Sequence, residues 1–252
     1  MFNHKLTYIL LKAAQIVFDE GIGYPILLGD PVRIKNIAAS NKIDLEGLPI
    51  FDPRSDEMEE KRNQYAEIFF KKRNRKGFNA YEAKKVMRDR NYFGCMMVEC
   101  GDADAMISGL TKNYPDTIRP AIKTIGKEEG VNKIAGMYLM LTKKGPLFLA
   151  DTTVNFNPTA EELAEITLLV AKEVRNFNFI PRIAMLSYSN FGSSDSSEAK
   201  LVAAARKLVK QKMPSLIVDG EMQANVAFNK ELLKENYPFS ELIDKDVNTL
   251  IF

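Results

Sequence analysis

The residues best suited to chemistry lie in the stretch 101–121, which is rich in small residues and ends near an arginine. Its pattern predicts a buried strand over 103–108, a turn at Ser108 and Gly109, and then a helix that carries Arg119. The first turn of a helix has unpaired N–H groups and the positive end of the helix dipole, which together suit an anion such as phosphate. The alternative interpretation is ordinary turn chemistry with a surface arginine, because this arrangement occurs throughout α/β proteins.

A second loop has the same small-residue character and runs from 187 to 197. Small residues let backbone N–H groups approach a phosphate closely. The alternative is a flexible, solvated loop. The candidate anion contacts of the two loops are their serine, threonine and glycine residues Ser108, Gly109, Thr111, Ser187, Ser189, Gly192 and Ser193.

Arg73 and Arg75 stand at the predicted end of a charged helix over 56–72. One interpretation is structural, because a cation at the C-terminus of a helix interacts favourably with the helix dipole. The other is that a planar guanidinium reaches into a cleft and binds phosphate or carboxylate through two parallel hydrogen bonds. The residues alone leave both interpretations open.

The sequence predicts no metal site. Asp219 and Glu221 follow a short apolar run as a strand end with two carboxylates, but no third acidic or histidine ligand has suitable spacing. We therefore expect them to be hydrogen-bonded turn residues. Because His4 is the single histidine, we expect neither histidine-based catalysis nor a histidine-rich metal site. Cys95 and Cys100 lie in an apolar stretch and are expected to be core thiols of a cytoplasmic protein.

The composition is that of a soluble globular protein. The chain has 252 residues, 46% of them hydrophobic, and a formal net charge of +2. Proteins that bind the phosphate backbone of nucleic acids usually have a strong basic excess, so we expect no nucleic-acid partner. No apolar run is long enough to span a bilayer, and we expect no membrane association.

Predicted helices and strands alternate along the chain, which indicates open, mostly parallel sheets with helices on both faces. A β-hairpin is expected over 133–151 as the one antiparallel feature. The chain begins in a helix and ends in an apolar strand, which favours a fragment of a longer protein. Helices are predicted over 6–18, 32–43, 56–72, 79–99, 115–126, 158–177, 198–212 and 223–235, and strands over 25–29, 48–51, 103–108, 133–142, 147–151, 182–187, 216–219 and 247–252.

These motifs together resemble the phosphate acetyltransferase/butyryltransferase family over essentially the whole chain. Within the family, the sequence is most similar to the C-terminal phosphotransacetylase-like domain of bacterial NAD(P)-dependent malic enzymes. Active phosphate acetyltransferases usually have a His-Ser-Thr or His-Ser-Ser sequence where this chain has Lys112, Asn113 and Tyr114. The motifs that carry the family resemblance are 101–109, 116–121, 151–162, 184–189 and 219–223, and those that favour the malic enzyme domain are 112–114, 125–126, 141–146, 189–193 and 237–240.

The resemblance implies a two-domain, three-layer α/β fold with a ligand cleft between the domains. It implies a first domain over 1–126, an inserted second domain over 127–246, and a strand over 247–252 that returns to the first domain. In family enzymes, coenzyme A binds in the cleft and its thiolate attacks the carbonyl of acetyl phosphate. The resemblance implies that Arg73 and Arg119 hold the phosphoryl group.

The same resemblance places the family's catalytic aspartate and its serine–arginine pair beyond the end of this chain. No catalytic residue is therefore assigned, and we expect no acetyl transfer by these 252 residues. No tightly bound cofactor is implied. The leading hypothesis is a regulatory domain that binds acetyl-CoA or coenzyme A, joined in the parent protein to a malate-oxidising catalytic domain and forming a homo-oligomer. The second hypothesis is a phosphate acetyltransferase that uses acetyl phosphate, and the third is a purely structural oligomerisation module.

Overall fold

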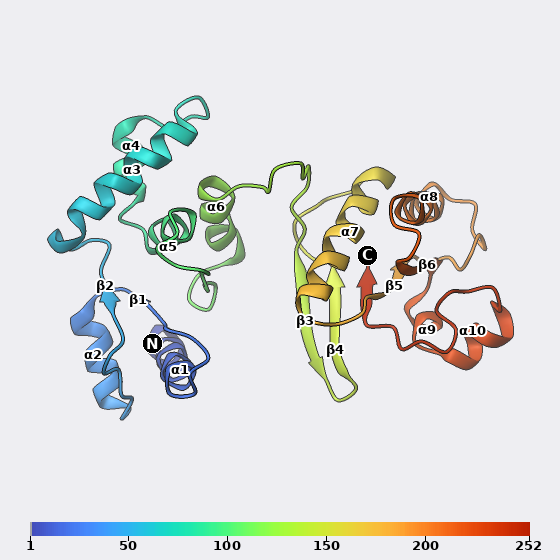
Figure 1. The fold of residues 1–252 in the computed structure, drawn as a ribbon, viewed down its shortest axis with the longest axis horizontal. Helices are drawn as coiled ribbons and strands as arrows, with labels where there is room; N and C mark the ends of the chain where they lie inside the picture. The colour runs from blue at the N-terminus through green and yellow to red at the C-terminus, as the bar shows by residue number, and fades with distance from the viewer. Residues whose placement is uncertain (1) are drawn as a thin grey trace. The chain divides into compact units, whose positions relative to one another are not determined.

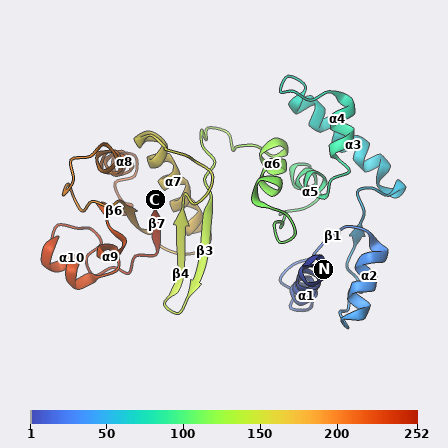
Figure 2. The same ribbon diagram turned by 180° about the vertical axis from the view of Figure 1, so that it is seen from behind.

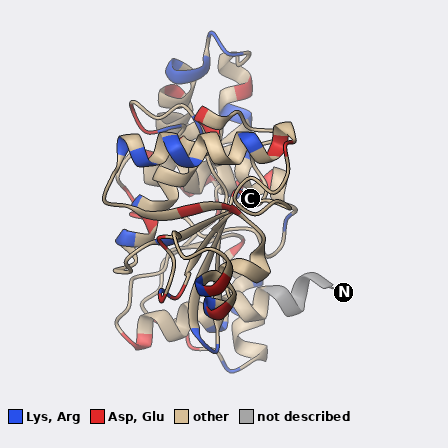
Figure 3. Ribbon diagram, turned by 90° about the vertical axis from the view of Figure 1, so that its right-hand side faces the viewer, with Lys and Arg blue, Asp and Glu red and all other residues tan. Residues whose placement is uncertain are grey.

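A computed structural model describes residues 2–252, with side chains described from residue 7 onward (Figure 1). The chain forms two compact units, residues 1–126 and residues 127–252. No helix among the described residues is long and apolar enough to cross a membrane. Figure 3 shows basic and acidic residues on the ribbon, with basic residues prevailing on the upper helix that faces the viewer.

The first unit is mainly helical, with a two-stranded parallel sheet of Leu27–Leu28 (β1) and Ile50–Phe51 (β2). Its helices begin at clear sequence signals. Asp30 accepts hydrogen bonds from the first N–H groups of α2, and Asn79 forms a capping box at the start of α4. The helices of this unit are α1 (Phe2–Asp19), α2 (Pro31–Ser40), the 3-10 helix η1 (Asp56–Met58), α3 (Glu59–Arg73), α4 (Ala80–Val86), α5 (Arg90–Glu99) and α6 (Tyr114–Thr124).

Two predictions for this unit were wrong. The expected single helix over 79–99 is two helices, because Asp89 caps a new start with bonds from the N–H groups of Asn91 and Tyr92. The expected buried strand over 103–108 is irregular, mostly exposed chain. Asp102 ties its beginning to the core through the Tyr65 hydroxyl at 2.5 Å, so a side chain rather than a sheet positions this segment.

The second unit is an α/β sandwich around a five-stranded sheet of order β3-β4-β7-β5-β6 (Figures 1 and 2). The predicted hairpin is confirmed, since β3 and β4 pair antiparallel; the other neighbouring strands are parallel. The elements are β3 (Met137–Thr142), β4 (Gly145–Ala150), α7 (Ala160–Asn176), β5 (Arg182–Leu186), α8 (Ser197–Lys212), β6 (Ile217–Met222), α9 (Ala224–Ala227), α10 (Lys230–Asn236) and β7 (Thr249–Ile251).

The last strand differs from its expected position. Residues 247–252 were expected to return to the first domain, but β7 lies inside the second sheet, between β4 and β5. Phe148 pairs with Thr249 on one side, and Ala184 pairs with Leu250 on the other. The reason is burial: all three residues of β7 are buried, and a central position in a parallel sheet covers an apolar strand on both faces.

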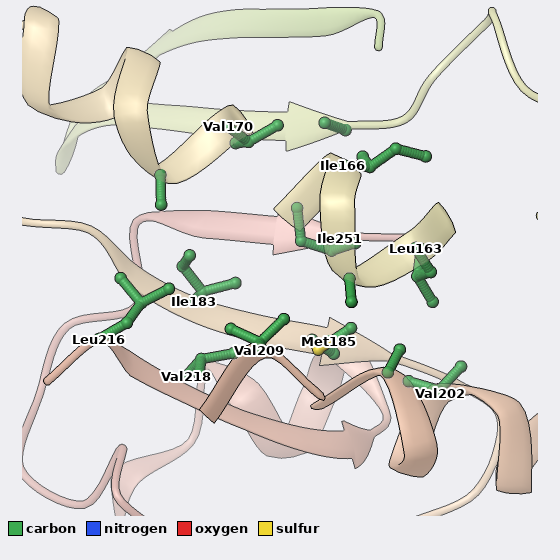
Figure 4. Close-up of a cluster of buried hydrophobic side chains, with 14 of the residues drawn as sticks. Leu163, Ile166, Val170, Ile183, Met185, Val202, Val209, Leu216, Val218 and Ile251 are labelled. Atoms are coloured by element: carbon green, nitrogen blue, oxygen red, sulfur yellow. The ribbon is translucent and has the colours of Figure 1, made fainter. Parts of the chain in front are cut away.

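The core of the second unit fills both faces of this sheet. Helices α7 and α8 cover one face, where Ile166 and Val209 pack around Ile183 and Met185 (Figure 4). Helices α9 and α10 contribute to a separate cluster with residues from β5 and β7 on the other face. Helices on both faces of a mostly parallel sheet confirm the predicted α/β class.

Candidate anion-binding site

Arg73 is the last residue of α3, and its side chain reaches the C-terminal end of helix α6. Its Nε donates to the Lys123 carbonyl at 2.6 Å, and its Nη2 donates to the Ile122 carbonyl at 2.7 Å. The last carbonyls of a helix lack intrahelical partners and carry the negative end of the dipole, so a guanidinium there is well satisfied. Arg73 thus has a structural role, because it satisfies two carbonyls at the end of α6.

Arg119 lies on α6 itself and is exposed, with a loose ion pair to Asp116 at 3.8 Å. Both arginines nevertheless act on one group, the hydroxyl of Tyr92 on α5. Burial raises the pKa of Tyr92, and Asp89 adds to this, whereas the charges of Arg119 and Arg73 pull that pKa down. The charges of both predicted arginines thus influence the pKa of this one tyrosine.

A polar network joins this tyrosine helix to the segment before α6. The Ser108 hydroxyl donates to Asn91 Oδ1 at 2.9 Å, and the buried Asn91 donates to the Asp116 carbonyl at 3.2 Å. Gly109 follows with a φ of +123°, which only glycine adopts readily, so the chain turns there toward α6. Ser108 and Gly109 thus lie near the first turn of α6, where a Cβ on Gly109 would be 4.0 Å from the Thr117 side chain, and Thr111 is exposed two residues further on.

Lys112 is a further cation of this group, and the sequence prediction did not include it. Its Nζ lies 2.7 Å from Asp89 Oδ2. Burial opposes ionisation of Asp89, but the hydrogen bond from Lys112 and the N–H groups of Asn91 and Tyr92 hold the pKa of Asp89 below its ordinary value. Asp89 therefore stays ionised and is a weak base.

The N-terminus of α6 is capped by the chain itself. Asn113 accepts the N–H of Asp116 on its side-chain oxygen at 3.1 Å and that of Thr117 on its carbonyl at 3.2 Å. Pro115 has no N–H to offer. The donors that the sequence suggested for an anion are thus largely occupied, and the positive charge of the group comes from side chains.

The second predicted loop closes around a carboxylate of its own chain. Glu221 is 3% exposed, and its Oε1 accepts the Ser189 hydroxyl at 3.1 Å and the Gly192 N–H at 2.5 Å. Ser193 Oγ accepts the Asn190 N–H at 2.9 Å. In the same loop Ser187 Oγ accepts the N–H of Ser189 at 3.2 Å. The donors of Ser189 and Gly192 are therefore occupied by Glu221 of the same chain, and a ligand anion at this loop stays a prediction.

Glu221 was expected at a strand end, and the structure corrects this. Strand β6 continues to Met222, so Asp219 and Glu221 both lie within it and are both buried. Asp219 is held by Arg206 at 3.3 Å and by the Glu241 N–H at 3.0 Å. No group of three metal-ligating side chains occurs among the described residues.

Two further features lie outside this group. Cys95 is buried as predicted, but Cys100 is exposed, because it follows the last residue of α5. A groove of about 630 Å³ lies between α1 and α2 and is lined by residues such as Tyr8, Arg33 and Asn41. It contains none of the predicted site residues. The arginine group belongs to the first unit and the Glu221 loop to the second, and their convergence on one ligand stays a prediction.

Comparison with known proteins identifies the family. Residues 7–252 match the family described as Phosphate acetyl/butaryl transferase. The chain is 34% identical to a phosphate acetyltransferase of Bacillus subtilis over 252 residues, which cover all of this chain and 76% of that protein. It is also 34% identical to an NAD-dependent malic enzyme of Rhizobium meliloti over 248 residues, but these cover only 32% of the malic enzyme.

The solved structures agree. The EutD phosphotransacetylase from Staphylococcus aureus superposes with a TM-score of 0.82 at 30% identity, over 96% of this chain and 73% of that one. An α/β protein with this fold and these motifs falls in the class of acyl-phosphate transferases and their relatives. The chain belongs to the phosphate acetyl/butaryl transferase family.

Proposed function

We propose that this chain is a regulatory domain that binds acetyl-CoA through its arginine group and belongs to a malic enzyme. The supporting observation is that Arg73, Arg119 and Lys112 lie along α6 or next to its ends, while nearby carboxylates are already paired. Asp89 is bound to Lys112, and Asp116 faces Arg119. Such a group attracts a phosphate or a diphosphate.

The same pairing argues against catalysis by this group. A thiol with a pKa near ~8.5 needs a base or a strongly electropositive site to attack a carbonyl at neutral pH. A carboxylate whose pKa is lowered by a lysine takes up a proton poorly, and this describes Asp89. Binding without turnover is therefore the behaviour that the described side chains support.

A regulatory role requires that the ligand bind two states of the assembly with different affinity, typically by about 1–3 kcal/mol. We propose that acetyl-CoA, bound here, changes malate oxidation in a catalytic domain of the same cytoplasmic protein. The malic enzymes of Rhizobium meliloti and Escherichia coli, each 34% identical to this chain over about a third of their length, support that context.

The second candidate is a phosphate acetyltransferase, which transfers an acetyl group between acetyl phosphate and coenzyme A. The observation in its favour is coverage: the chain spans 76% of the Bacillus subtilis enzyme and 73% of the Staphylococcus aureus structure. The two candidates share a ligand and differ in turnover. One experiment can therefore separate them.

The experiment is calorimetric titration of acetyl-CoA into the chain and into Arg119→Ala, with acetyl phosphate-dependent acetyl-CoA synthesis measured on the same samples. Loss of one charged hydrogen bond costs about 1.5–3 kcal/mol, so Arg119→Ala should weaken binding about ten- to hundred-fold. The matched control is Arg54→Ala, which removes another exposed arginine of the first unit and should leave binding unchanged. Turnover would favour the acyltransferase, and absence of binding would contradict both candidates.

A further inference from the structure

Helix α6 contains a proline in its interior. Pro120 follows Arg119 directly and is buried. In a regular helix, the N–H of residue 120 would donate to the carbonyl of Asp116, four residues earlier. Proline has no N–H, and its ring also crowds that carbonyl. The Asp116 carbonyl is therefore left without its usual partner inside the helix.

A side chain of α5 supplies the missing hydrogen bond. Helices α5 and α6 pack side by side (Figures 1 and 2), and the Asn91 side-chain amide donates from Nδ2 to the Asp116 carbonyl at 3.2 Å. Asn91 is 4% exposed, so its amide has little access to water and needs partners within the protein. Asn91 thus completes the hydrogen bonding of α6 at the point where Pro120 interrupts it.

The amide of Asn91 also holds the turn before α6. Its Oδ1 accepts the Ser108 hydroxyl at 2.9 Å. The orientation of the amide follows from its partners, because a backbone carbonyl only accepts and the Nδ2 group must face it. The position of Asn91 is fixed in turn by Asp89, which caps α5 and accepts the Asn91 N–H at 2.9 Å. One buried amide therefore connects the Ser108 turn to the helix of Arg119.

The other end of α6 is held separately. Lys72 and Arg73, at the end of α3, donate to its last carbonyls. Arg119 lies between the two attachments, one turn after the carbonyl that Asn91 binds and directly before Pro120. The side chain of Arg119 has only an ion pair of 3.8 Å, so its direction depends mainly on the backbone of this turn.

We propose that Asn91 is a positioning residue of the anion-binding site. Its amide replaces the hydrogen bond that Pro120 removes, and it thereby fixes the turn of α6 that carries Arg119. Asn91 acts through Arg119 and touches no ligand itself. The inference rests on the proposed function, because it assigns Arg119 to ligand binding.

The test is a double-mutant cycle in the full chain between Asn91 and Pro120. Pro120→Ala restores a backbone N–H that can pair with the Asp116 carbonyl, so the amide is no longer needed there. Since one net hydrogen bond corresponds to about a five-fold change in an equilibrium constant, Asn91→Ala should speed hydrogen exchange in α6 about five-fold more in the wild-type background than in the Pro120→Ala background. The matched control is Asn41→Ala, which removes an amide that donates to the Ile37 carbonyl at 2.7 Å in α2 and should have the same effect in both backgrounds.

Ligand affinity separates a positioning role from a purely structural one. In calorimetric titration with acetyl-CoA, Asn91→Ala should weaken binding about five- to ten-fold, and adding Pro120→Ala should restore most of the affinity. Asn41→Ala should bind as the wild-type chain does. A residue that only stabilises the fold would leave the affinity of the folded chain unchanged. Circular dichroism checks folding, and Asn91→Asp, which keeps an acceptor for Ser108 but has no N–H donor, replaces Asn91→Ala if the latter unfolds.

A third measurement needs no ligand. The NMR signal of the Arg119 Nε–H group, assigned by its absence in Arg119→Ala, should shift in Asn91→Ala and return toward its wild-type position in the double variant. Exchange effects of Asn91→Ala that are equal in both backgrounds, an unmoved Arg119 signal, or unchanged affinity would each overturn the inference. A wild-type chain that does not bind acetyl-CoA contradicts the proposed function instead, and exchange and NMR then decide the role of Asn91.

Discussion

The two arginines of the candidate site should respond differently to removal, and Arg73→Ala is the decisive change. Arg73 closes the C-terminal end of α6 with hydrogen bonds of 2.6 and 2.7 Å to two backbone carbonyls. Arg119 is 59% exposed and has only an ion pair of 3.8 Å. We therefore expect Arg73→Ala to lower stability and Arg119→Ala to leave it nearly unchanged.

The magnitude follows from these contacts. A hydrogen bond from a charged group contributes about 1.5–3 kcal/mol, and a cation at a helix C-terminus adds about 0.3–1 kcal/mol. Because Arg73 is half-buried, solvent weakens both contributions, and we expect a net loss of about 2 kcal/mol. An exposed pair three residues apart on a helix contributes about 0.2–0.5 kcal/mol, which sets the expectation for Arg119→Ala.

The assay is urea unfolding followed by circular dichroism, together with hydrogen exchange on peptides from α6. The exchange measurement is needed because the chain has two units and its unfolding need not be two-state. In Arg73→Ala, the last turn of α6 should exchange faster, whereas peptides from β5 should not change. If Arg73→Ala and Arg119→Ala have equal stability, the contact at α6 is not structural and the reasoning fails.

Three further predictions concern the second unit. Glu221→Gln keeps a hydrogen-bond acceptor but removes the negative charge from the closed loop, so the free energy of unfolding in urea should fall by about 1–2 kcal/mol. The control, Glu235→Gln at an exposed position, should lower it by less than about 0.5 kcal/mol. Equal losses in the two variants would refute the role of the Glu221 carboxylate. Burial opposes ionisation of Asp151, but hydrogen bonds from a side-chain amide and from backbone N–H groups outweigh it and lower its pKa. Its stabilisation is therefore present above the unfolded-state pKa of about 3.9 and is lost as the pH falls through the lower folded-state pKa, so Asp151→Asn should flatten the decline in stability below about pH 4; an unchanged slope would contradict this. Gly220→Ala should destabilise by at least about 2 kcal/mol more than Gly145→Ala, because both glycines have positive φ but only at Gly220 would a Cβ clash with a backbone oxygen, that of Met185. Similar melting temperatures for the two variants would show that the backbone at Gly220 adjusts.

Much of the fold was predictable because local signals were strong. The hairpin, the capped helix α7 and the strand β5 follow from apolar periodicity and from a capping box at Thr159. The position of β7 was not predictable from its own residues. The apolar sequence of a strand indicates that the strand is buried, but it does not indicate to which sheet the strand belongs.

In the candidate site, too, local features were predictable from the sequence and the partners from distant segments were not. The residue types at Ser189 and Gly192 indicated a loop with donors for an anion, because small residues and backbone N–H groups are a local property. That the anion is Glu221 depends on β6 running beside β5, and pairing between strands is a property of the whole sheet. A loop of this composition therefore has two possible occupants, a ligand or a carboxylate of its own chain, and only the neighbouring strand decides between them. The same holds for Arg73: its position at the end of its own helix, α3, was predictable from the sequence, but its contact with the end of α6 was not.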